Sequence, residues 1–188
     1  MRPSTPRKFT LLDAMVLIAA TGIALVPVRL YQWENWHLPE RWSASEILYA
    51  GLDANIVLVP PALALTAALW LLRMMPPRPR IRRVFRQPGL AAGTTTIVLA
   101  LAALMSFLIY ASIDRGIHFE SVNEMNLWTR IGMIPMFLAG NAVAAVWFVM
   151  WLSGTWRSEP SWIDRAGRAL GVYWVTISVL FGWIFYAG

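Results

Sequence analysis

Asp53 is the side chain whose position most suggests chemistry, because it lies about six residues inside a long apolar stretch. An ionisable group at the centre of a membrane helix costs about 2.5–3.5 kcal/mol, so such groups face a bundle interior and find partners. Asn55 follows two positions on, and Arg130 could pair with Asp53 from another apolar stretch. These residues could form a proton or cation site. We favour the simpler interpretations, a structural ion pair with Arg130 or a carboxylate wetted at the outer membrane surface.

Asn141 is a second polar group expected at membrane depth, and it completes the candidate ligand or ion site with Asp53, Asn55 and Arg130. It follows Gly140 in a stretch rich in small residues. Small residues four positions apart let helix backbones approach closely, and asparagine can hydrogen-bond across such a contact. We expect these faces to pack within the chain, with packing against another subunit as the alternative. The spaced pairs are Gly140 and Ala144, Ala20 and Ala24, Gly167 and Gly171, and Ser178 and Gly182.

Motifs for catalysis or cofactor binding are missing from the sequence. The chain has no cysteine, which rules out disulfides, thiolate metal sites and thiol catalysis. Its two histidines, His37 and His118, fall between the apolar stretches and not within them, which disfavours haem ligation. Neither a nucleophile elbow, a zinc-protease motif nor a phosphate-binding loop is present. We therefore predict a protein that is not an enzyme and that has no cofactor or metal.

Five apolar stretches dominate the chain, and 58% of its 188 residues are hydrophobic. Soluble domains average about 45–50% apolar residues, whereas a membrane span needs about 20 mostly apolar residues. We predict an all-α, polytopic transmembrane helical bundle that forms one domain over residues 1–188 and uses almost the whole chain. The expected spans lie near residues 11–28, 47–72, 90–113, 127–152 and 169–187.

The distribution of basic residues predicts the orientation. Cytoplasmic connections of membrane proteins carry an excess of Lys and Arg. Twelve of the 16 basic residues lie before the first span, between the second and third spans, or between the fourth and fifth. The other four are Arg29, Arg41, Arg115 and Arg130. We expect a multi-pass protein of the cell inner membrane with its N-terminus in the cytoplasm and its C-terminus outside.

The connection over residues 73–89 is the most basic part of the chain, and Pro76, Pro77, Pro79 and Pro88 oppose a helix across it. We expect an extended segment on the cytoplasmic leaflet, where arginines meet anionic headgroups. Docking of a cytoplasmic partner is the alternative. The net charge of +6 is explained in this way and not by nucleic-acid binding. The candidate headgroup ligands are Arg78, Arg80, Arg82, Arg83 and Arg86.

Local signals mark where several helices begin. A hydroxyl residue followed three positions later by a carboxylate is a capping box, which satisfies the first N–H groups of a helix. Within the spans, Pro60-Pro61 and Pro135 are expected to break or kink the second and fourth helices. The three capping boxes are Thr10 with Asp13, Ser43 with Glu46, and Ser161 with Asp164.

The segment Lys8-Phe-Thr-Leu-Leu-Asp13, with the apolar helix after it, resembles the start of a type IV pilin. Lys8 replaces the processed glycine, Asp13 replaces the usual glutamate, and four further spans have no pilin counterpart, so we reject that assignment. The same twenty residues resemble the first helix of uncharacterised small membrane proteins of planctomycete-type bacteria. That resemblance implies a membrane helix and no particular activity.

The sequence favours a non-catalytic accessory or scaffold subunit that packs against other membrane proteins. Short connections, small-residue helix faces and the missing active-site motifs support this hypothesis. The alternative is a small transporter or channel component that uses the polar residues around Asp53 and Asn141 and the proline-containing helices.

Overall fold

The computed structural model describes residues 9–35, 44–75, 86–113, 124–157 and 159–187. These residues form helices and no strands, which confirms the predicted all-α class. Each helix coincides with one of the apolar stretches. The helices are α1 (Leu11–Asn35), α2 (Ala44–Met74), α4 (Pro88–Ile113), α5 (Glu124–Leu152) and α6 (Trp162–Ala187).

The predicted capping signals are present at two helix starts. At α1, the Thr10 N–H donates to Asp13 Oδ2 at 3.0 Å and the Asp13 N–H donates to Thr10 Oγ1 at 3.3 Å, which is the full reciprocal box. At α6, the Asp164 N–H donates to Ser161 Oγ at 3.4 Å. The third predicted box needs Ser43, which lies outside the described residues.

The prolines inside two helices do not end them. Helix α2 is continuous through Pro60 and Pro61, and α5 is continuous through Pro135. Of the predicted break or kink, the break is therefore wrong for both helices, and helix continuity does not test the kink. A proline removes one N–H and crowds the carbonyl four residues before it, and neighbouring helices make this tolerable when they pack against the site. Ala62, directly after the proline pair, is buried in such a contact with residues of α5 and α6.

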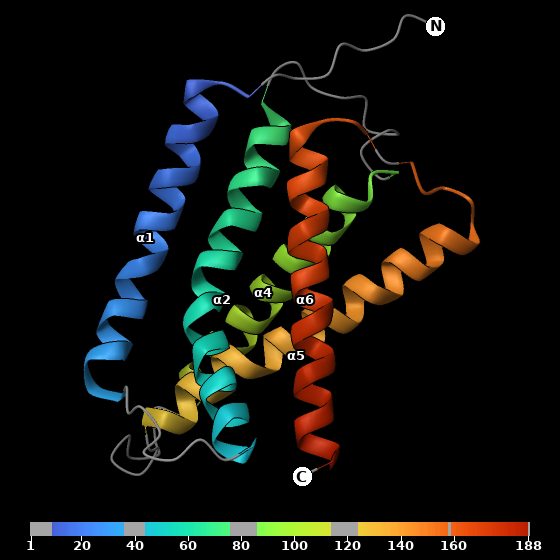
Figure 1. Ribbon diagram of the computed structural model, residues 1–188. Coiled ribbons are helices and arrows are strands. Elements are labelled where there is room, and N and C mark those ends of the chain that lie inside the picture. The colour runs from blue at the N-terminus through green and yellow to red at the C-terminus, as the bar shows by residue number, and fades with distance from the viewer. Residues whose placement is uncertain (1–8, 36–43, 76–85, 114–123, 158, 188) are drawn as a thin grey trace, which may run out of the picture.

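Consecutive helices run in alternate directions, so α1 begins at the opposite end of the bundle from the one where α6 ends (Figure 1). Helices α4, α5 and α6 pack on one another, α2 packs on α4 and α6, and α1 packs against α2. The last turn of α2 and the first turns of α4 and α6 therefore meet at one end of the bundle. The candidate site described below lies at this end.

Glycines allow the closest helix contacts. A Cβ at Gly140 would collide with the Trp174 carbonyl oxygen and with Ser178, so α5 crosses α6 almost backbone to backbone. A Cβ at Gly171 would meet the ring of Trp147, and one at Gly167 would meet the backbone of Gly89. These contacts confirm that the small residues of α5 and α6 pack within the chain.

Apolar side chains cover the outside of the bundle as well as its core. Two segments, Val57–Met74 and Pro88–Ser106, are long and apolar enough to cross a membrane, and Leu11–Val26 and Leu138–Leu152 are shorter apolar helices. Every helix also exposes large hydrophobic residues. Each of the five helices provides an example whose exposed fraction lies between 49% and 72%: Ile18, Leu58, Val98, Phe148 and Val179.

Candidate functional site

The structure does not test whether Asp53, Asn55, Arg130 and Asn141 form the predicted site. Asp53 and Arg130 lie on α2 and α5, but their side chains are outside the described part of the structure, so the predicted pair is untested. Asn55 is half-buried on α2, whereas Asn141 is exposed on α5. Of the candidate headgroup ligands, Arg86 is exposed just before α4, and Arg78, Arg80, Arg82 and Arg83 lie outside the described residues.

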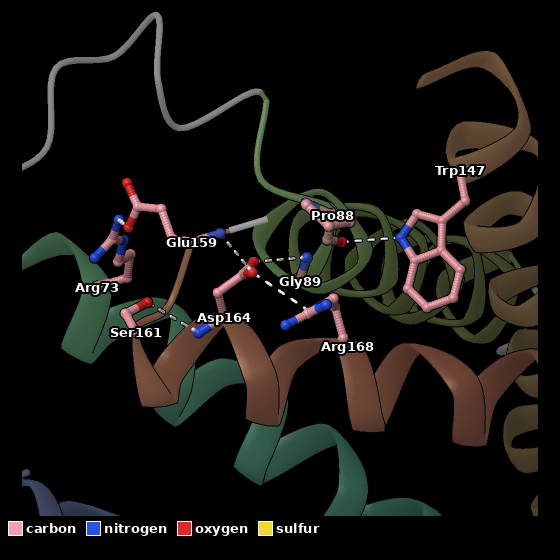
Figure 2. Close-up of polar contacts among 8 residues, drawn as sticks. All are labelled: Arg73, Pro88, Gly89, Trp147, Glu159, Ser161, Asp164 and Arg168. Carbon is pink, nitrogen blue, oxygen red and sulfur yellow. Dashed lines mark hydrogen bonds and ion pairs between the residues drawn. The ribbon is translucent and has the colours of Figure 1, made fainter. Parts of the chain in front are cut away.

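Asp164, in the first turn of α6, takes part in several polar contacts (Figure 2). Its Oδ1 accepts a hydrogen bond from the Gly89 N–H at 3.1 Å, and its Oδ2 accepts one from the Glu159 N–H at 3.2 Å. The Arg168 guanidinium lies 3.4 Å from Oδ2, one helical turn further on. One carboxylate thus serves the N-termini of two helices, where the exposed N–H groups and the helix dipole favour a negative charge.

A second ion pair lies at the same end of the bundle. Arg73, in the last turn of α2, donates from Nη2 to Glu159 Oε2 at 2.5 Å. Its side chain is only 10% exposed. Since Glu159 also donates its N–H to Asp164, the two ion pairs are joined through the segment before α6. This segment therefore ties α2, α4 and α6 together.

The first residues of α4 are held from several sides. The Trp147 indole N–H of α5 donates to the Pro88 carbonyl at 2.9 Å, as Figure 2 shows. The Arg157 N–H donates to the Arg86 carbonyl at 3.0 Å. Pro88 itself occupies the first helical position, where a missing N–H costs nothing. The α4 terminus is thus fixed by α5 and by the α5–α6 connection.

Burial raises the pKa of Asp164 above its ordinary value of 3.8. The Gly89 N–H, the Arg168 charge and the Glu159 N–H act in the opposite direction because they favour the ionised form, but they do not outweigh desolvation. The buried carboxyl group of Asp164 therefore binds its proton more tightly than an exposed aspartate does.

A pocket of about 20 Å³ adjoins this cluster between α2, α4 and α6. About 10–15 Å³ is enough for one water molecule, so the pocket has room for at least one. Some lining residues belong to the helix ends, and others lie two to three turns further into the bundle. Among them are Arg73, Gln87 and Asp164 at the ends, and Thr66, Thr96 and Trp174 further in.

Four of the lining side chains bury a hydrogen-bond donor for which the described residues provide no partner. They are Arg73 at Nε, Gln87 at Nε2, Thr96 at Oγ1 and Trp174 at Nε1. Exposure is 8% for Arg73 and lower for the other three. Most buried polar side-chain atoms in proteins have a partner, so these four donors are available to water or to a ligand in the pocket. The Thr66 hydroxyl, in the same pocket, donates instead to the Ala62 carbonyl at 2.7 Å.

The described residues include no group of three or more histidines, aspartates or glutamates that could hold a metal ion. No described histidine is available to activate Thr96, since both histidines of the chain lie in undescribed segments. What the pocket offers is a set of fixed N–H and O–H groups.

Only part of this cluster and pocket could be predicted from the sequence. Ser161 and Asp164 were recognised as a helix start, but the bond from Gly89 to Asp164 joins positions 75 residues apart. The residues Gln87-Pro88-Gly89 are typical of a helix N-terminus and say nothing about a pocket. Thr96 and Trp174 look like ordinary members of apolar spans.

No protein-family model, curated protein or solved structure matches this chain. The N-terminal resemblance to small planctomycete-type membrane proteins therefore stays a prediction.

Proposed function

We propose that this chain is a multi-pass inner-membrane protein with five spans that serves as a non-catalytic accessory subunit of a membrane complex. The observation that carries the membrane assignment is the exposure of large apolar side chains on all five helices. Soluble monomers rarely expose continuous apolar surfaces of this kind, whereas lipid covers them without cost. The two segments of spanning length support the same assignment.

The placement of charge at the helix ends supports the proposed orientation. Arg73, Arg86, Arg157, Arg165 and Arg168 all lie where α2 ends and where α4 and α6 begin. Alternating helix directions bring these positions to one end of the bundle (Figure 1). An arginine-rich end is typical of the cytoplasmic side.

The exposed face of α5 favours the accessory role. Asn141 is exposed there, and the exposed residues Leu138, Ala145 and Phe148 lie at helical spacing around it. Small Ala145 between the larger apolar residues leaves room for close packing, so this face suits a partner helix. We propose that α5 carries the contact with the partner subunit.

Co-purification from native membranes tests this function. The tagged full-length chain is extracted in a mild detergent, and the proteins recovered with it are identified and quantified by mass spectrometry. We expect a membrane protein at a stoichiometric level, and Asn141→Leu should lower its recovery at least several-fold. Ser106→Ala is the matched control, because it changes an exposed polar residue on another helix, α4. Recovery of the chain alone would contradict the accessory role.

A further inference from the structure

We propose that Arg86 and Arg157 bind the headgroup of one anionic phospholipid, whose acyl chains lie along the exposed aromatic side chains at the end of α5. This inference rests on the proposed membrane-spanning bundle, because only a protein embedded in lipid meets such a ligand there. It does not depend on the accessory role. What it adds is a class of lipid and its place on the protein.

The two arginines belong to connections far apart in the sequence, but their backbones are in direct contact. The Arg157 N–H donates to the Arg86 carbonyl at 3.0 Å. Both side chains are exposed. Two long basic side chains therefore begin at neighbouring points of the surface, and in that arrangement they can bind one phosphate group together.

Neither arginine has an ion-pair partner among the described residues. The acidic residues before and in the first turn of α6 are engaged elsewhere. Glu159 pairs with Arg73, and Asp164 lies beside Arg168. Two neighbouring positive charges repel each other, whereas an anion is attracted by both. The planar guanidinium group donates parallel hydrogen bonds to phosphate oxygens, and basic sites between helices on the cytoplasmic side suit anionic headgroups.

The connection after α5 holds Arg157 in place. Gly154 has a φ of 62°, a left-handed conformation that turns the chain back at the end of the helix. The Trp156 N–H then donates to the Met150 carbonyl at 3.2 Å. The ring of Trp156 packs edge-on against that of Trp147, with the ring centroids 5.7 Å apart. A residue fixed in this way loses little further backbone freedom when a ligand binds.

Arg86 is held by the same part of α5. The Trp147 indole N–H donates to the Pro88 carbonyl at 2.9 Å (Figure 2), two residues after Arg86. Trp147 thus contacts the segment that carries Arg86 and, through Trp156, the segment that carries Arg157. One side chain of α5 therefore positions both arginines.

An exposed aromatic surface begins beside the two arginines. Trp156 directly precedes Arg157 and is exposed. Trp151 lies one turn after Trp147 on α5 and is also exposed. Phe148 stacks on Trp151, with the ring centroids 6.2 Å apart, and is exposed as well. Since tryptophan rings settle at the level of the headgroups, acyl chains below a bound phosphate would meet this surface.

Native mass spectrometry of the purified full chain in a neutral detergent, at physiological ionic strength, counts the bound lipids. Phosphatidylglycerol and phosphatidylcholine are titrated separately, because both carry a phosphate but only phosphatidylglycerol has a net negative headgroup. We expect a site for a single phosphatidylglycerol, with a Kd about tenfold lower than that of phosphatidylcholine.

Substitutions of single arginines locate the site. Arg86→Gln and Arg157→Gln should each raise the Kd for phosphatidylglycerol about tenfold, because each removes a charged donor. Both keep the hydrogen bond between the two positions, since backbone atoms make it. Arg165→Gln is the matched control, because it removes an exposed arginine from α6 at the same end. It should change the Kd less than about twofold, since salt screens attraction from a distance.

Glycerol phosphate tests a free phosphate as the alternative ligand, because it has no acyl chains. We expect that it does not displace phosphatidylglycerol at equal concentration. Displacement would overturn the lipid site and assign the arginines to a soluble phosphate. An equal Kd for the two lipids, or an equal rise in Kd for Arg165→Gln, would also overturn it. A chain that stays in solution without detergent would instead contradict the membrane-spanning bundle, so the two failures can be distinguished.

Discussion

The carboxylate of Asp164 accepts the backbone N–H of Gly89 at 3.1 Å and thereby joins the first turn of α6 to the first turn of α4. The Glu159 N–H donates to the other oxygen of the same side chain. Asp164 is thus a capping residue for its own helix and for a second helix far away in sequence. Through Glu159, which pairs with Arg73, Asp164 is also connected to the last turn of α2.

Replacing Asp164 with alanine should destabilise the bundle strongly. The Gly89 and Glu159 N–H groups would lose their acceptor, and each buried unsatisfied group costs about 1–3 kcal/mol. We expect Asp164→Ala to lower the free energy of unfolding by about 2–4 kcal/mol, measured by denaturant unfolding in detergent. Thr10→Ala, which removes only a local cap at α1, should cost about 1 kcal/mol. Equal losses in the two variants would show that Asp164 is only a local cap.

The stability contributed by Asp164 should decrease as pH rises. Its pKa is raised by burial, so the folded protein holds the proton more tightly than the unfolded chain does. The contribution is therefore fully present below the ordinary pKa of 3.8 and is lost between that value and the raised pKa of the folded state. The measurement is the difference in unfolding free energy between wild type and Asp164→Asn across this pH range. An increase with pH would mean that hydrogen bonding and Arg168 outweigh burial.

Adding one methyl group at Gly140 should disrupt the contact of α5 with α6. A Cβ there would collide with the Trp174 carbonyl oxygen and with Ser178, which cannot both move aside. We expect Gly140→Ala to destabilise the protein by about 1–3 kcal/mol, as overpacking of a tight contact does. Gly22→Ala on α1 is the control, because nothing lies within 4 Å of its added Cβ. Gly22→Ala should be neutral or stabilising by about 0.5–1 kcal/mol, since alanine favours helix.

The ion pair between Arg73 and Glu159 should be energetically coupled. The Arg73 side chain is 10% exposed and that of Glu159 is 31% exposed, so solvent screens the pair only partly. We expect a coupling energy of about 1–2 kcal/mol in a double-mutant cycle of Arg73→Met and Glu159→Gln, between the values for surface and buried pairs. Additive effects of the two substitutions would show that the pair has no net influence on stability.

The sequence predicted the helices well and the polar contacts poorly, for a physical reason. Apolar length places a helix directly, and the box of Thr10 with Asp13 involves neighbours along the chain, so both can be recognised locally. The partners of Asp164 and Arg73 come from other helices, and their meeting depends on how the bundle packs. The predicted helix break at Pro60-Pro61 is absent for the same reason, since Ala62 packs against residues of other helices and α2 is continuous there.

The candidate site was predicted even less completely. Asp53 is conspicuous in the sequence because a charge within a span is unusual, whereas the pocket is lined by Thr96, Trp174 and Gln87, which are common in membrane helices and at helix starts. Only the three-dimensional arrangement shows that their donors share one pocket and that the Thr66 hydroxyl is already engaged.

Cysteine accessibility tests the membrane assignment most directly, because the chain has no cysteine of its own. Single-cysteine variants Arg157→Cys, at the arginine-rich end, and His118→Cys, in a connection predicted to face outward, are treated with a membrane-impermeant maleimide in intact cells. We expect labelling at position 118 only, and labelling at position 157 only after the membrane is opened. Labelling of both positions in intact cells, or recovery of the chain in the soluble fraction, would contradict the proposed membrane-spanning bundle.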